Sequence, residues 1–214
     1  MRIKWSELAL AVGVLAVSAA AQAVPPKVEV AVLPGGGTIV VPTKSVPPSV
    51  EMLSNACAGC HGVKGSSVGP SMPSLAGQSK VFFVDAMKKF KSVERPGTVM
   101  SRLAKGYTDE QVLLMADYFA QQKPQAQNAA VDPTLVTRGK AVYDAACKRC
   151  HLENGKEFEE DTPVVAGQWL KYLQIQMSEF QSGKRKMSEK KIEKVKALTN
   201  ADWDAVAHFY ASQK

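Results

Sequence analysis

The sequence predicts an all-α protein with two tandem helical domains related by internal duplication. A Cys-x-x-Cys-His motif occurs twice, ending at His61 and at His151, and the two copies lie 90 residues apart. The same separation relates Ala76-Gly77-Gln78 to Ala166-Gly167-Gln168. Apolar residues in both copies recur at helical spacing, and neither copy contains a run typical of a strand. A repeat sustained over this length indicates one structural unit used twice.

The first 23 residues have the pattern of a secretory signal peptide. Arg2 and Lys4 precede an almost wholly apolar stretch, residues 8–20, and Ala21-Gln22-Ala23 fits an A-x-A cleavage site. The apolar stretch is too short to span a bilayer comfortably. We therefore expect residues 1–23 to be a signal peptide, the protein to be periplasmic, and no stable membrane span to remain after cleavage.

Residues 24–48 belong to neither copy and form a Pro/Gly-rich N-terminal arm. They contain six prolines and the run Gly35-Gly36-Gly37. Residues 28–33 and 38–41 could pair as a short hairpin around that run, or the segment could stay extended. Its composition favours a flexible leader, and an arm that drapes over a partner subunit is the alternative.

The first helical domain is expected at residues 49–123. A helix over 49–56 leads into the first cysteine motif, and residues 80–91 form a second helix with apolar residues at helical spacing. Thr108 and Gln111 resemble a helix-start box for the terminal helix. The apolar face of that helix consists of Val112, Met115 and Phe119.

A polar linker at residues 124–133, which begins and ends with proline, precedes the second domain at residues 134–214. In the second domain we expect helices over residues 137–146 and 169–180. A terminal helix is expected to start at the pair Thr199 and Asp202. Its apolar face consists of Trp203, Val206 and Tyr210. Each domain has only about 80 residues, a size at which an apolar core is marginal without help. A large buried cofactor would supply the missing apolar surface.

The chain has a formal net charge of +7 and a sequence pI near 9.2. No basic stripe with interleaved aromatic residues is present, so we expect no nucleic-acid partner. A mild positive field is better suited to docking on an acidic protein. The basic residues between 184 and 191 are most simply a solvated face.

The spacing of the four cysteines points to covalent cofactor attachment. Cysteines of an exported chain usually form disulfides, but these lie in two C-x-x-C-H motifs, the attachment signature of haem c. Each thiol forms a thioether with one vinyl group of the porphyrin, and the adjacent histidine ligates the iron. A zinc site would need a fourth ligand, and a dithiol redox pair would need neither the histidine nor the repeat. The residues expected to hold two haem c groups are Cys57, Cys60, His61, Cys147, Cys150 and His151.

The sixth iron ligand is expected to be a methionine. The chain has only three histidines, and two bis-histidine haems would need four, which leaves His208 for a surface or cap role. Two methionine pairs recur in both copies, Met87 with Met177 and Met100 with Met187. The first pair lies within amphipathic helices and is typical of core filling. Met100 and Met187 lie on connections between helices, where a thioether sulfur can approach the iron from the face opposite the histidine.

Two further groups of residues are expected near the haems. Pro73 and Pro163 each follow their motif histidine by twelve positions, so their backbone carbonyls could accept the imidazole N–H and fix its tautomer. Trp169, Tyr172 and Trp203 are expected to be core residues that pack against haem.

These residues resemble a known family. The stretch from Cys57-Ala58-Gly59-Cys60-His61-Gly62 to Leu75-Ala76-Gly77-Gln78 is similar to dihaem c-type cytochromes. A closer resemblance is to the haem subunit of flavocytochrome c sulfide dehydrogenase. It rests on Met-Ser-Arg-Leu-Ala-Lys-Gly-Tyr at 100–107, Ala-Gly-Gln-Trp at 166–169 and Phe-Tyr-Ala-Ser-Gln at 209–213.

The resemblance implies two tandem class I cytochrome c domains that act within a two-subunit enzyme. A separate flavoprotein subunit carries FAD and oxidises sulfide, and this subunit passes electrons through its two haems to a soluble c-type cytochrome. In that family, methionines at the positions of Met100 and Met187 complete the haem sites. The chain itself has no expected catalytic residue, because all four cysteines are committed to haem.

Two other functional classes also use two c-type haems. The alternative is a free-standing dihaem cytochrome c that shuttles electrons to a terminal oxidase. A dihaem peroxidase would need one haem with an open or displaceable site, and two methionine ligands argue against it.

Overall fold

The computed structural model describes residues 28–32, 38–42, 49–157 and 162–214. The predicted signal peptide, residues 1–23, lies outside the described residues. Two compact units divide the chain, one ending at Pro47 and the other running from Pro48 to Lys214. Within the described segments, no helix is long and apolar enough to cross a bilayer.

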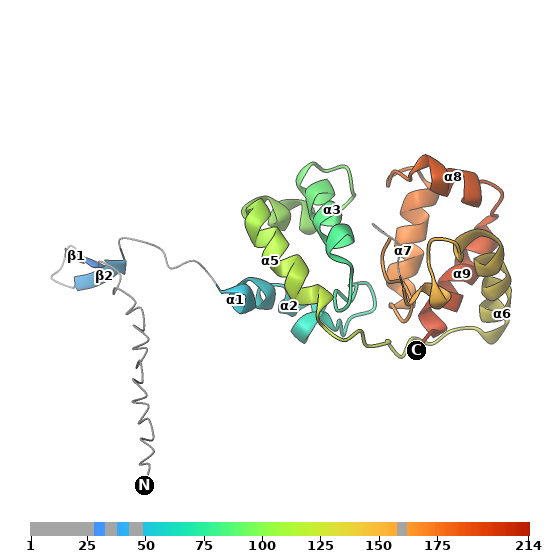
Figure 1. Cartoon of the computed structure of the whole chain (residues 1–214), viewed down its shortest axis with the longest axis horizontal. Coiled ribbons are helices and arrows are strands. Elements are labelled where there is room, and N and C mark those ends of the chain that lie inside the picture. Colours follow the sequence, from blue (N-terminus) through green and yellow to red (C-terminus); the bar gives the residue numbers. More distant parts are fainter. Residues whose placement is uncertain (1–27, 33–37, 43–48, 158–161) are drawn as a thin grey trace, which may run out of the picture. The chain divides into compact units, whose positions relative to one another are not determined.

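The N-terminal unit contains a two-stranded antiparallel hairpin (Figure 1). Strand β1 covers Val28–Val32 and β2 covers Thr38–Pro42, with Val30 opposite Val40. Of the two arrangements that the sequence left open for this arm, the hairpin is confirmed. Both strands are rich in valine, whose branched side chain suits extended backbone.

The second unit contains both repeats. The first repeat consists of α1 (Val50–Asn55), α2 (Ala58–His61), η1 (Val63–Gly65), α3 (Lys80–Lys91), α4 (Met100–Leu103), η2 (Ala104–Gly106) and α5 (Asp109–Ala120). Ser49 and Ser79 cap α1 and α3, because each hydroxyl accepts a backbone N–H of the first turn. The core of this repeat comprises Leu53, Phe83, Ala86, Met87, Ala104, Val112, Met115, Ala116 and Phe119.

The second repeat consists of α6 (Pro133–Val142), the π-helical turn η3 (Tyr143–Cys147), η4 (Glu153–Gly155), α7 (Leu170–Gln181), α8 (Glu189–Val195) and α9 (Asn200–Ser212). The helix expected to start at residue 137 begins at Pro133, because the Asp132 side chain caps it and proline is favoured in the first turn. Helix α8 was not predicted. Helices α6 and α9 pack closely at Gly139, where a Cβ atom would lie 2.0 Å from the Ala205 carbonyl oxygen (Figure 1).

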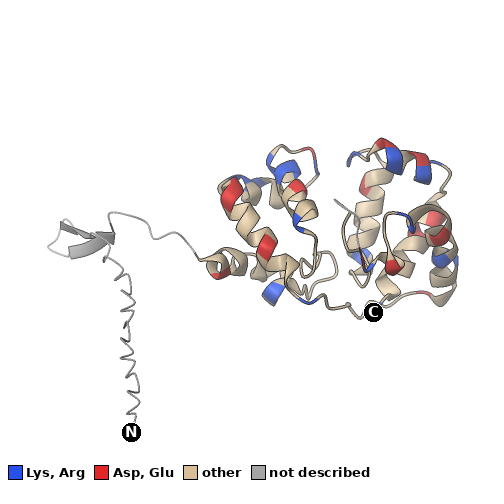
Figure 2. Ribbon diagram, viewed as in Figure 1, with Lys and Arg blue, Asp and Glu red and all other residues tan. Residues whose placement is uncertain are grey.

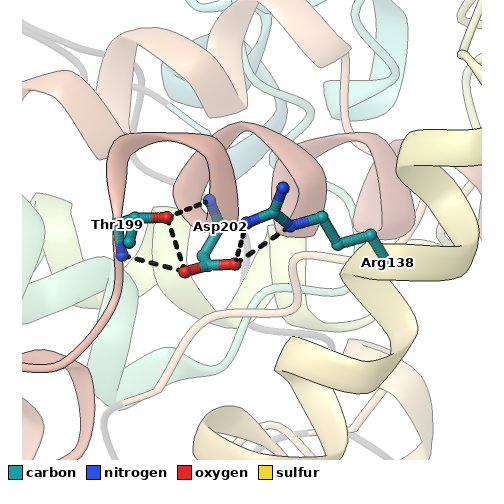
Figure 3. Close-up of polar contacts among 3 residues, drawn as sticks. All are labelled: Arg138, Thr199 and Asp202. Atoms are coloured by element: carbon teal, nitrogen blue, oxygen red, sulfur yellow. Dashed lines mark hydrogen bonds and ion pairs between the residues drawn. The ribbon is translucent and has the colours of Figure 1, made fainter.

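Both predicted helix-start boxes form, but only the second one can titrate. In the first repeat, the Gln111 amide oxygen accepts the Thr108 N–H at 2.9 Å. In the second, a carboxylate oxygen of Asp202 accepts the Thr199 N–H at 2.9 Å and the Thr199 hydroxyl at 2.7 Å. Arg138 on α6 donates to the other carboxylate oxygen at 2.8 Å (Figure 3). These hydrogen bonds, with that from Thr199 the strongest, lower the pKa of Asp202 from 3.8 to about 2.

We expect the Asp202→Asn variant to lose up to about 1 kcal/mol of stability at neutral pH, because the amide oxygen can still accept the Thr199 N–H but the negative charge facing Arg138 and the start of the helix is lost. Because the folded-state pKa of Asp202 is below its ordinary value, this contribution is present above pH 4 and lost as the pH falls towards 2. The difference in urea midpoint between wild type and variant should therefore shrink between pH 4 and pH 2. A Gln111→Ala control should show a difference that does not vary with pH. A pH-independent difference for Asp202→Asn would contradict the assignment.

Candidate haem sites

The first cysteine motif is shaped by a short helix. Cys57 precedes α2, and the N–H of His61 donates to the Cys57 carbonyl at 2.9 Å, so the motif folds into one helical turn. Cys57 is half-buried and Cys60 is exposed, and neither forms a disulfide. Burial raises the pKa of the Cys57 thiol, and the neighbouring Cys60 adds to this. The turn therefore presents two thiols and an imidazole from five consecutive residues.

The His61 ring is oriented by the predicted backbone carbonyl. Its Nδ1 lies 2.8 Å from the Pro73 oxygen. Because a carbonyl oxygen only accepts, Nδ1 carries the proton and Nε2 keeps its lone pair for a metal. Burial also lowers the pKa of His61, which favours the neutral ring that ligates iron.

The second motif places His151 in a similar but less complete setting. The pKa of His151 is lowered to about 4, mainly by burial and also by the positive charge of Lys191, while the Pro163 carbonyl partly opposes this shift. His151 Nδ1 is nevertheless buried without a hydrogen bond of normal geometry. The predicted role of the proline carbonyl is thus confirmed in the first repeat, whereas in the second the Pro163 contact falls short of a hydrogen bond.

A cavity of about 560 Å³ lies beside the second motif. It is lined by both motif cysteines, His151 and Met187, together with apolar residues of α7, α8 and α9. The apolar part of the lining includes Leu173, Met177, Phe180, Val195, Trp203 and Val206 of these helices, Leu198 between α8 and α9, and Phe82 and Ala86 of the first repeat. Two thiols, a buried neutral imidazole and a thioether around a large apolar space are the donor set and the shape that haem c needs.

The four methionines that recur in the two repeats lie either in the core of the first repeat or beside the cavity of the second motif. Met100 starts α4 and packs against the first core cluster, as Cys57 also does. Met187 lines the same cavity as His151. Met87 is buried in the first core, as expected for core filling. Met177 is half-buried and also lines the cavity, so it borders the cofactor space as well as the core.

Two expectations for single residues need correction. His208 is buried, not at the surface, and its Nδ1 accepts the N–H of Asp132, the residue that caps α6. Lys191 is not a solvated residue, because it lines the cavity with its ammonium 3.5 Å from the centre of the Phe180 ring. Burial there, followed by the charge of Arg185, lowers the pKa of Lys191 to about 7. Its neighbours on α8 are exposed lysines and glutamates of mixed sign (Figure 2).

The predicted aromatic residues divide between the cavity and the contact between repeats. Trp203 and Tyr172 line the cavity. Trp169 instead donates its indole N–H to the Ser67 carbonyl of the first repeat, at 3.3 Å.

Tyr143 is a site residue that sequence reasoning missed. Its hydroxyl donates to the His151 carbonyl at 2.8 Å and accepts the Asn154 N–H at 2.9 Å, so it fixes the chain on both sides of the motif histidine. Leu53 stands at the equivalent place 90 residues earlier and has no such group. The change from leucine to tyrosine between the two copies is the feature of the sequence that could have indicated this role.

The cytochrome c family matches residues 136–214 of the chain. The thiosulfate dehydrogenase electron acceptor of Thiomonas intermedia is 30% identical over 155 residues, which cover 66% of this chain and 70% of the relative. Cytochrome c4 of Azotobacter vinelandii is 31% identical over 54% of this chain and 62% of its own length. The cytochrome subunit of sulfide dehydrogenase from Chlorobaculum tepidum is 48% identical over 48 residues, 22% of this chain and 44% of the relative.

A solved structure agrees with these relatives. Cytochrome c4 of Acidithiobacillus ferrooxidans superimposes with a TM-score of 0.66 at 28% identity, covering 74% of this chain and 99% of the other. The chain belongs to the cytochrome c family. It is a dihaem electron-transfer cytochrome with covalent haem c, and the predicted fold class and the predicted resemblance to the sulfide dehydrogenase subunit are both confirmed.

The two halves of this dihaem cytochrome c are joined by a reciprocal pair of glutamines. Gln78 donates to the Val164 carbonyl at 2.8 Å and accepts the Val164 N–H at 3.1 Å. Gln168 makes the same two hydrogen bonds with Ser74, both at 2.9 Å. Gln78 and Gln168 are 90 residues apart, as are Ser74 and Val164. The contact is therefore pseudo-twofold, and the Ala-Gly-Gln motif of each repeat binds the backbone of the other.

Proposed function

We propose that this cytochrome is a periplasmic electron-transfer subunit that accepts electrons from an FAD-containing sulfide dehydrogenase flavoprotein and passes them to a soluble c-type cytochrome. The observation that carries the proposal is the direct contact of the first repeat with the second haem site, because the second cavity is lined by residues from both repeats. The 48% identical segment shared with the sulfide dehydrogenase subunit supports the choice of donor.

In this proposal each haem is held by two thioethers and two axial ligands. Cys57 and Cys60 attach the first haem and His61 and Met100 bind its iron. The equivalent residues of the second site are Cys147, Cys150, His151 and Met187. Support comes from the shared cavity of His151 and Met187 and from the shared core contact of Cys57 and Met100. When bound, each haem supplies a one-electron iron couple, while the chain positions it and excludes water.

In this proposal the flavoprotein partner, and not this chain, oxidises sulfide. All four cysteines are used for attachment, so the chain offers no thiol for sulfur chemistry, and FAD is expected on the flavoprotein alone. The periplasmic location is supported by the signal-peptide pattern of residues 1–23.

A second candidate is a free-standing shuttle that delivers electrons to a terminal oxidase. It is favoured by the match to cytochrome c4, which covers 99% of the solved chain. The thiosulfate dehydrogenase electron acceptor matches a longer part of this chain than the sulfide dehydrogenase subunit does. The identity of the donor is therefore what an experiment must decide.

The test is purification of the native protein from its source, followed by reduction with defined donors. We expect a yellow flavoprotein to co-purify, sulfide to reduce both haems only in its presence, and a soluble cytochrome c to reoxidise them. A flavin-free dihaem monomer that is reduced by a thiosulfate dehydrogenase and not by the flavoprotein with sulfide would overturn the proposed donor. A flavin-free monomer oxidised directly by a terminal oxidase would favour the shuttle.

A further inference from the structure

Two arginines occupy equivalent positions in the two repeats and meet at one place. Arg95 lies on the connection between α3 and α4, and Arg185 lies 90 residues later on the connection between α7 and α8. Arg95 is only 7% exposed. Both side chains line the cavity of the second haem, although Arg95 belongs to the first repeat.

The two guanidinium groups converge on the same neutral oxygen. Arg95 donates to Gln176 Oε1 at 2.9 Å, with a longer contact of 3.4 Å to the Tyr172 hydroxyl. Arg185 donates to the same Gln176 oxygen. Each guanidinium also lies on the phenylalanine of its own repeat, 4.7 Å from the centre of Phe90 and 4.5 Å from the centre of Phe180. Stacking of this kind holds the planar groups in fixed orientations.

The charges of these arginines are not balanced by a carboxylate. No ion pair involves either of them among the residues that the structure describes. Of the nearby acids, Glu179 accepts from the Gln176 amide at 3.1 Å, and Asp85 forms its ion pair with Lys89. Two like charges that share one amide oxygen at a buried site are unfavourable unless an anion joins them.

The cavity itself indicates which anion this is. Haem c carries two propionate carboxylates on the porphyrin edge, and the guanidinium fork matches a carboxylate with two parallel hydrogen bonds. The hydrogen bonds described above use one terminal nitrogen of each arginine, and a guanidinium has five N–H donors in all. Donors therefore remain for a carboxylate on the cavity side.

We propose that Arg95 and Arg185 bind the propionates of the second haem, so that a residue of the first repeat completes the cofactor site of the second. The site is thus shared between the repeats, and the haem itself helps to join them. This inference rests on haem binding in the cavity and not on the identity of the electron donor.

The test is spectroelectrochemistry of the holoprotein with an Arg95→Gln substitution, after mass spectrometry has shown that two haems are still attached. A positive charge beside a haem favours its reduced form, which carries one positive charge fewer. At a fixed potential, we expect the ratio of reduced to oxidised second haem to fall about tenfold, equivalent to about 59 mV for one electron. The ratio for the first haem should change less. The two haems are distinguished by the nuclear magnetic resonance signals of their axial ligands.

Two further variants separate the charge of Arg95 from a general change in charge. Arg95→Lys keeps the charge and should retain most of the wild-type ratio. Lys123→Gln makes the same charge change at an exposed residue outside the lining of the cavity, and it should not shift the second haem. An unchanged ratio in Arg95→Gln, or an equal shift in Lys123→Gln, would overturn the proposal, even if the unfolding midpoint falls.

Discussion

The Met100→Ala variant is expected to lose the sulfur-to-iron absorption of one haem, which is half of the total band. The potential of that haem should fall on the order of 0.2 V, within the range of about 0.8 V that axial ligands span. The reason is that a thioether favours reduced iron more than water or a second imidazole does. Absorption spectra and a redox titration of the purified variant measure both effects.

Met87→Ala is the matched control for this experiment. Met87 lies in the same repeat and is buried in its core, so its removal should cost about 2–5 kcal/mol of stability. The absorption band should nevertheless stay complete. The equivalent test of the second site is Met187→Ala, which should also lose half of the band. If that variant keeps the full signal of two haems, the assignment of Met187 is wrong.

Replacing both Cys147 and Cys150 by serine is expected to prevent folding of the second repeat. Without attached haem, the cavity of about 560 Å³ beside the second motif loses the group that fills it. The apolar side chains of α7, α8 and α9 that line the cavity would then face water. Burial of one large apolar side chain is worth about 1.5–3 kcal/mol, so exposure of several of them approaches the total stability of about 5–15 kcal/mol of a typical domain. Only collapse of α8 over the cavity would lessen the loss.

Amide hydrogen exchange measures this prediction element by element. In the double variant, protection should disappear from α6 and α9 and remain in α3 and α5, whose haem is still attached. The matched control replaces Cys57 and Cys60, and there the loss should fall on the first repeat. Native-like protection of α9 in the Cys147 and Cys150 variant would show that the cavity does not need its cofactor.

Features that depend on local spacing were predicted from the sequence. The duplication, the two attachment motifs and the helix-start boxes each involve residues fewer than about five positions apart, or a constant separation of 90. The Pro73 carbonyl contact followed from its fixed distance to His61. Local hydrogen-bond geometry determines these features, so the order of residue types suffices to indicate them.

Features that depend on tertiary packing were not predicted. Arg95 reaches the second cavity because the connection between α3 and α4 brings its side chain to Tyr172 and Gln176 of α7. Lys191 was interpreted as solvated because its neighbours in the sequence are charged, yet it faces Phe180. His208 was placed at the surface or at a cap, and only the position of Asp132 shows that it is buried at the start of α6. Contacts of this kind depend on how the helices and their connections pack, and they leave no periodic signal in one sequence.

Covalent attachment of two porphyrins through the paired thiols underlies both haem sites and the proposed electron transfer. Intact-protein mass spectrometry under denaturing conditions tests this, combined with alkylation of free thiols. We predict a mass increase of two haems and no alkylated cysteine. A chain that carries four alkylated thiols, or two disulfides, and no added porphyrin mass would contradict it.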